Sequence, residues 1–102
     1  MDTFKLIYRI LRFLDCMTKC EEFDYKSFSA NHNGVSEKQW ADTLEMLVDR
    51  ELIKGISINR AADGSAMTSL LSPRITLTGL EHLRGNEFML KESSAAKGSA
   101  GG

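Results

Sequence analysis

The sequence predicts a small α+β domain in which helices precede a β-hairpin and one further helix follows it. Three observations lead to this fold class. Apolar residues near the N-terminus recur at helical spacing, a second apolar stripe follows a strong helix-start signal at Ser36, and an Asp63-Gly64 pair separates two segments suited to β-strands. With 102 residues, 42% of them hydrophobic, the chain has the length and composition of one globular domain with a modest core.

The first helix is expected from about Phe4 to Lys19. Its apolar residues recur every three to four positions and form a broad face that comprises Leu6, Ile7, Ile10, Leu11, Phe13, Leu14 and Met17. The remaining face carries a basic ridge of Lys5, Arg9, Arg12 and Lys19. The broad apolar face fits the central helix of a small core. It also fits a helix whose Leu6, Tyr8 or Phe13 contacts a second subunit, which would make the protein a homodimer through this helix.

A short helix follows in the prediction. Asp24 is expected to cap one or two turns of helix through Ser29, with Phe23 and Phe28 anchoring them to the core. Residues 31–34 read Asn-His-Asn-Gly and predict a turn, because Asn and Gly tolerate positive φ.

The second long helix has the clearest start signal in the chain and is expected to end near Glu51. Ser36 is its N-cap, and Gln39, three residues later, completes a capping box. Its buried stripe comprises Trp40, Leu44, Leu47 and Val48. The short helix, the turn and this helix together form a helix-turn-helix pattern.

Residues 52–60 and 66–71 predict the two strands of a hairpin. Asp63-Gly64 favours a two-residue type I′ turn, in which both central positions have positive φ. That turn pairs Ile58 with Ser69 and Ile56 with Leu71. The apolar face of the ribbon then carries Ile56, Ile58, Met67 and Leu71, and the polar face carries Ser57, Asn59 and Thr68.

A last helix is expected to open at Thr78, with Glu81 completing a second capping box. It is expected to run to about Lys91 with apolar contacts from Leu80, Leu83, Phe88 and Leu90. Residues 92–102 are rich in Gly, Ser and Ala and predict a flexible tail, so the domain is expected to span residues 1–91. The order of helix, short helix, helix, β-hairpin wing and C-terminal helix is that of a winged helix-turn-helix.

A resemblance to a known family rests on three segments: Trp40–Asp49, Leu52–Ile56 and Pro73–Leu83. With roughly residues 3–90 around them, they resemble the YjcQ-type family of small winged-helix proteins from Gram-positive bacteria and their phages. The Ile-Thr-Leu-Thr run at residues 75–78 is the most recognisable part, and many winged-helix domains share it. The resemblance implies a winged-helix fold and a phage or prophage protein. It implies no established activity and no catalytic residues.

Several function classes are not indicated. The 13 basic and 14 acidic residues give a net charge of −1, which excludes nucleic-acid binding through bulk positive charge alone. The chain has no phosphate-binding loop, nucleophile elbow or His-Glu-x-x-His motif, so we expect neither an enzyme nor a cofactor. Cys16 and Cys20, even with His32 and His82, match no usual zinc spacing. Without a signal peptide or a membrane-spanning apolar run, the expectation is a cytoplasmic protein of a bacterial host.

Two binding functions stay open. In a DNA-binding helix-turn-helix the second helix enters the major groove. Here Lys38 and Gln39 would contact bases, while Asn59, Arg60 and Arg74 near the wing would contact the phosphates of double-stranded DNA. Residues 37–51, however, hold five acidic and two basic residues, a net charge of −3 that opposes DNA binding. The alternative is a protein partner that contacts the acidic face of this helix at Asp42, Glu45 and Asp49.

Overall fold

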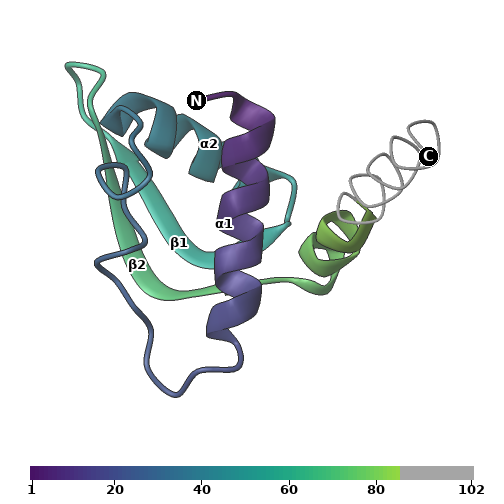
Figure 1. Ribbon diagram of the computed structural model, residues 1–102. Helices are drawn as coiled ribbons and strands as arrows, with labels where there is room; N and C mark the ends of the chain where they lie inside the picture. The colour runs from purple at the N-terminus through teal and green to yellow at the C-terminus, as the bar shows by residue number, and fades with distance from the viewer. Residues whose placement is uncertain (86–102) are drawn as a thin grey trace.

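The computed structural model describes residues 1–85. Its elements are helix α1 (Thr3–Met17), helix α2 (Glu37–Asp49), strand β1 (Ile53–Arg60) and strand β2 (Ala66–Ile75), followed by a helix over residues 77–85. The two strands form one antiparallel hairpin, which curves around α1 and α2 from its tip at the upper left to its base beneath α1 (Figure 1). Three helices and a two-stranded hairpin confirm the predicted α+β class, in an arrangement compatible with a winged helix.

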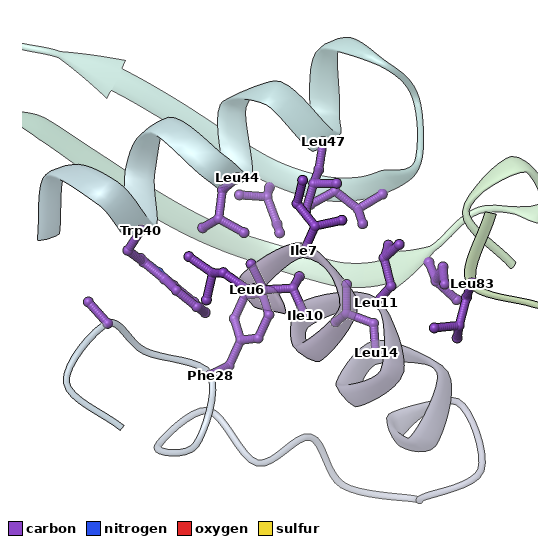
Figure 2. Packing of buried hydrophobic residues seen from close by; sticks show 14 residues of the cluster. Leu6, Ile7, Ile10, Leu11, Leu14, Phe28, Trp40, Leu44, Leu47 and Leu83 are labelled. Carbon is purple, nitrogen blue, oxygen red and sulfur yellow. The ribbon is translucent and has the colours of Figure 1, made fainter. Parts of the chain in front are cut away.

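The core lies where α1, α2 and the inner face of the hairpin meet (Figure 2). The two helices contribute most of it: Leu6, Ile7, Ile10, Leu11 and Leu14 from α1, and Trp40, Ala41, Thr43, Leu44 and Leu47 from α2. The remaining members are Phe28 and Ala30 from the segment between the helices, Ile53, Ile56 and Ile75 from the hairpin, and Leu83 from the last helix. Leu6 is fully buried in this core, so it is not available to contact a second subunit as the broad apolar face of the first helix suggested.

The segment between α1 and α2 is not helical. Residues 25–27 form a turn in which the Asp24 carboxylate accepts hydrogen bonds from the Ser27 amide (3.3 Å) and hydroxyl (2.6 Å). These local bonds replace the helical pattern, as short polar side chains often do. The prediction of a short helix from Asp24 to Ser29 is therefore wrong, although its anchors are correct. Phe28 stacks on Phe13 with ring centroids 5.6 Å apart, and Phe23 packs edge-on against the same pair.

Helix α2 begins as the sequence predicts, but its capping box is incomplete. The Ser36 hydroxyl accepts from the Gln39 amide at 3.0 Å. In a complete capping box the Gln39 side chain would accept from the Ser36 amide. Here it instead donates to the Met1 carbonyl at 2.7 Å. The helix ends in a left-handed Glu51 (φ 59°), where the Leu52 amide donates back to the Leu47 carbonyl at 2.9 Å.

The register of the hairpin differs by one residue from the prediction, because its loop is longer. Ile56 pairs with Leu70 and Ile58 with Thr68. The connection is a turn with a Gly64 amide to Ala61 carbonyl bond (3.0 Å), and only the glycine of the Asp-Gly pair has positive φ. A shift of one residue moves every side chain of a strand to the other face. The expectation that Met67 and Leu71 are buried and Thr68 exposed is therefore wrong: Met67 is 72% and Leu71 75% exposed, and Thr68 lies across from Ile58.

A bulge separates the upper hairpin from its base. Between the pairs Lys54–Arg74 and Ile56–Leu70, β2 has three residues where β1 has only Gly55. Gly55 has φ of 79°, and a Cβ there would overlap the Ser72 carbonyl, so the position requires glycine.

The last helix begins at residue 77, and its N-cap is Thr76, two residues before the predicted cap. The Thr76 hydroxyl, not that of Thr78, accepts from the Gly79 amide at 3.0 Å and donates to the Glu51 carbonyl at 2.6 Å. This hydroxyl joins the helix start to the turn that follows α2. The contacts expected of Phe88 and Leu90, and the tail at residues 92–102, lie outside the described residues.

Candidate functional site

Residues of the two functional hypotheses meet in one cluster on the surface of α2. Arg60, at the end of β1, donates from Nη2 to Asp42 Oδ1 (2.8 Å) and to Glu45 Oε1 (2.9 Å). Its Nε lies 3.4 Å from Glu45 Oε2, so the guanidinium grips Glu45 with two nitrogens. Lys38 Nζ lies 2.7 Å from the other oxygen of Asp42. We refer to Lys38, Asp42, Glu45 and Arg60 as the charge cluster.

The geometry of helix and strand explains why these side chains meet. Lys38, Asp42 and Glu45 are four and three residues apart, which places them on one face of α2. Along β1, alternation puts Arg60 on the same face as Ile58 and buried Ile56, the face that packs toward α2. This alternation was visible in the sequence and is the signal that links Arg60 to the acids of α2.

The cluster is a balanced set of two cations and two carboxylates. Hydrogen bonds first from Lys38 and then from Arg60 hold the pKa of the Asp42 carboxyl below its ordinary value. Hydrogen bonds to Glu45 and Asp42 raise the pKa of Arg60 above its already high value. The side chains of Arg60, Asp42 and Glu45 remain partly open to solvent, with 38% to 41% of each exposed. Arg60 is therefore accessible, but its donors are directed at carboxylates of the same chain.

The other side chains predicted to read bases have structural roles as well. The Gln39 amide is engaged by the Met1 carbonyl at the start of the chain. Ala41, in the first turns of the same helix, is 2% exposed and packs inward. Of the expected base contacts, only Lys38 keeps a largely exposed side chain, and its ammonium is paired with Asp42.

Three predicted site residues lie apart from the charge cluster. Asp49 is exposed near the end of α2. Asn59 and Arg74 are exposed on the hairpin, where Asn59 pairs with Met67 and Arg74 pairs with Lys54 across the strands. The structure thus brings together four of the eight predicted binding residues, and the other four lie on α2, β1 and β2.

The segment before α2 also bears on DNA recognition. In a helix-turn-helix the first helix crosses the DNA backbone while the second lies in the groove. Here the corresponding segment, residues 24–29, is a series of turns fixed by Asp24 and the aromatic contacts of Phe28. The element that would position α2 on a duplex is not a helix in this chain.

Sequence reasoning missed the apolar side chains on the outer face of the hairpin. Met67 and Leu71 point away from the core because the loop has three residues rather than two. The sequence held one signal for this arrangement: a three-residue loop with a final left-handed Gly is the next most common hairpin connection.

Within residues 1–85, no three His, Cys, Asp or Glu side chains are grouped so as to hold a metal ion. Cys16 and Cys20 are free and exposed at the end of α1. None of the helices in this part of the chain is long and apolar enough to cross a membrane.

A family model described as "YjcQ protein" matches residues 8–99 of the chain, which is most of its length. No curated protein and no solved structure matches it.

Proposed function

The chain belongs to the YjcQ family, and from the charge cluster we propose that it is a non-enzymatic module that binds a protein partner rather than DNA. We place this activity in the cytoplasm of a bacterial host, the setting that the sequence suggests. The observation that carries the proposal is the position of Arg60, whose guanidinium is bound by Asp42 and Glu45.

Affinity for DNA comes largely from neutralising phosphates with free Lys and Arg side chains. Arg60 would have to leave two carboxylates to contact a phosphate, and that phosphate would then lie beside Asp42 and Glu45. The wing arginine beside α2 is thus used to compensate the acidic charge of that helix within the chain. A protein partner imposes no such requirement, because protein interfaces accept surfaces of mixed charge.

The charge cluster also reduces the negative charge of the acidic face of α2, the surface predicted to bind a protein partner. The acidic face expected at Asp42, Glu45 and Asp49 is neutralised at two of its three carboxylates by Arg60 and Lys38. Of these three carboxylates, only that of Asp49 forms no ion pair with another described residue. We therefore place the partner on another surface of the chain.

A titration with DNA tests the proposal. Fluorescence anisotropy would follow a labelled random-sequence duplex of about 20 base pairs as protein is added, at about 50 mM and about 200 mM salt. We expect no saturable binding at either salt concentration up to about 100 μM protein, since even non-specific DNA binders reach roughly micromolar affinity at low salt.

Micromolar binding that weakens about tenfold or more at the higher salt, and is lost in the K38A/R60A variant, would overturn the proposal. The matched control is K5A/R9A, which removes two cations from α1 and leaves the charge cluster intact. Loss of binding in the control alone would also establish DNA binding, but through α1.

A further inference from the structure

We propose that the outer face of the hairpin is the docking surface, and that it binds a segment of a partner protein in which carboxylates accompany apolar side chains. This inference rests on the proposed function and adds the place and the chemistry of the contact. It rests on exposed side chains of β1 and β2 that do not contribute to the core.

The outer face combines two kinds of side chain. Met67 and Leu71 are among the most exposed large apolar residues of the described chain, although both belong to a β-strand. In Figure 1 the helices lie on the inner side of the curved hairpin, which leaves this outer side uncovered by either. Exposed apolar surface that is rimmed by polar residues is typical of protein interaction sites when it is contiguous, and a partner bound along the strand would cover Met67 and Leu71 together.

Below the bulge the same face carries two cations. Lys54 and Arg74 are direct cross-strand partners and both are exposed. Neither forms an ion pair with any other residue in the described part of the chain. Like charges placed opposite each other on a sheet repel. A carboxylate from outside would relieve that repulsion.

No acid of the hairpin can supply this carboxylate. Residues 53–60 and 66–75 contain no Asp or Glu. Within the described part of the chain, Glu51, three residues before Lys54, forms no ion pair with Lys54 or Arg74. Asp63 lies in the loop at the tip, where its carboxylate accepts from the Ser65 amide (2.9 Å) and hydroxyl (2.7 Å). The third cation of the strands, Arg60, is turned inward to the charge cluster. The outer face therefore carries apolar Met67 and Leu71, neutral polar side chains between and beside them, and the two cations, but no acid. Its complement is a segment that combines apolar and acidic side chains.

The charge of the outer face also disfavours a second copy of the chain and duplex DNA as its binding partner. A second copy of the chain docked through the same face would bring four cations together without an acid on either hairpin. Duplex DNA would find only two cations, with Met67 and Leu71 pressed against its phosphates. An acidic, apolar peptide segment satisfies both parts of the face.

The spacing of the face constrains that segment. Arg74 lies three residues beyond Leu71, at most about 10 Å along an extended chain and less across a bulge. A peptide bound in extended form therefore needs Asp or Glu within about three residues of its apolar anchor.

The probe for the test is a displayed library of random 12-residue peptides, selected on the immobilised full chain. We expect enriched peptides that combine Asp or Glu with a nearby apolar residue. Synthetic copies should lose affinity about tenfold or more for M67S/L71S, since each substitution removes an apolar contact that the bound peptide would bury. They should also lose it for K54E/R74E. Two control variants should bind like the wild type: F4S/L77S, which removes exposed apolar side chains outside the hairpin, and K5E/R9E, which reverses two cations of α1.

Each other outcome overturns the inference in a distinguishable way. Peptides that bind all four variants equally would leave a protein-binding module whose docking surface is not this face. Enrichment of basic peptides, or no enrichment at all, would overturn the docking surface. Salt-sensitive binding in the DNA titration would instead overturn the proposed function on which the inference rests.

Discussion

Replacing Gly79 with alanine tests how the last helix is held against the core. By helix propensity alone, Gly79→Ala in the helix over residues 77–85 should stabilise the fold by about 1 kcal/mol. The structure predicts the opposite. A Cβ at this position would overlap the Leu52 carbonyl and lie 2.7 Å from Ile75 Cγ1, well inside ordinary contact at 3.4 Å.

The magnitude follows from what must move. Leu52 cannot yield freely, because its carbonyl accepts from the Thr76 amide at 3.0 Å. Inserting a methyl group into a packed site costs about 1–3 kcal/mol. Weakening that hydrogen bond costs about 1 kcal/mol. After the gain in propensity is subtracted, G79A should be less stable than the wild type by about 1–3 kcal/mol.

Urea unfolding measures this difference, with the fluorescence of Trp40 as the probe. Trp40 is the only tryptophan of the chain and is 4% exposed, so its emission should report loss of the core. The matched control is G85A in the same helix, where nothing lies within 4 Å of the added Cβ. The control should gain roughly 0.5–1 kcal/mol. If G79A were stabilised by as much as G85A, the close packing of the helix start on Leu52 would be refuted.

Three further predictions concern the connections between elements. T76V should lower the free energy of unfolding by about 1–2 kcal/mol, because the hydroxyl caps the last helix and also binds the Glu51 carbonyl; T76S should retain most of that stability in the same urea assay. E51G should raise the free energy of unfolding by about 0.5–1 kcal/mol, since the native residue has φ of 59°, and a loss of stability would show that the side chain matters more than the backbone. In a chain whose native cysteines are replaced by serine, N59C/M67C should oxidise to a disulfide readily and N59C/T68C should not, because only the first pair is in register; the reverse result, read by mass spectrometry, would restore the two-residue loop.

Features that depend on neighbouring residues in the sequence could be predicted. The face on which each strand side chain lies could not, because it depends on whether the hairpin loop has two or three residues. The start of α2 follows from Ser36 alone, and the bond from the Gln39 amide confirms it. The hairpin follows from the Asp63-Gly64 pair, but that pair is compatible with loops of two and of three residues. Since the loop length sets the register, the same uncertainty assigned Met67 to the wrong face.

The sequence predicted which residues belong to the candidate site, but not which of them form ion pairs with one another. Both hypotheses named members of the charge cluster, because each is a charged residue at an exposed position of α2 or of the hairpin. Whether Arg60 points to solvent or to α2 depends on how closely the hairpin packs on the helix, and the sequence holds no distance. The outer face required the register itself, so it emerged only from the structure.

The pKa of the Asp42 carboxyl reports whether the cations expected to bind DNA are instead bound by the acids of α2. A ¹³C NMR titration of the side-chain carboxyl measures this pKa in the wild type, K38A and R60A. We expect a wild-type pKa below the ordinary 3.8 that rises in each variant, with the larger rise in K38A because the Lys38 bond is the main cause. The favourable pairing would then be present above pH 3.8 and lost as the pH falls through the lowered pKa. A wild-type pKa at or above 3.8 that neither substitution changes would contradict the pairing, and with it the argument that this face does not bind DNA.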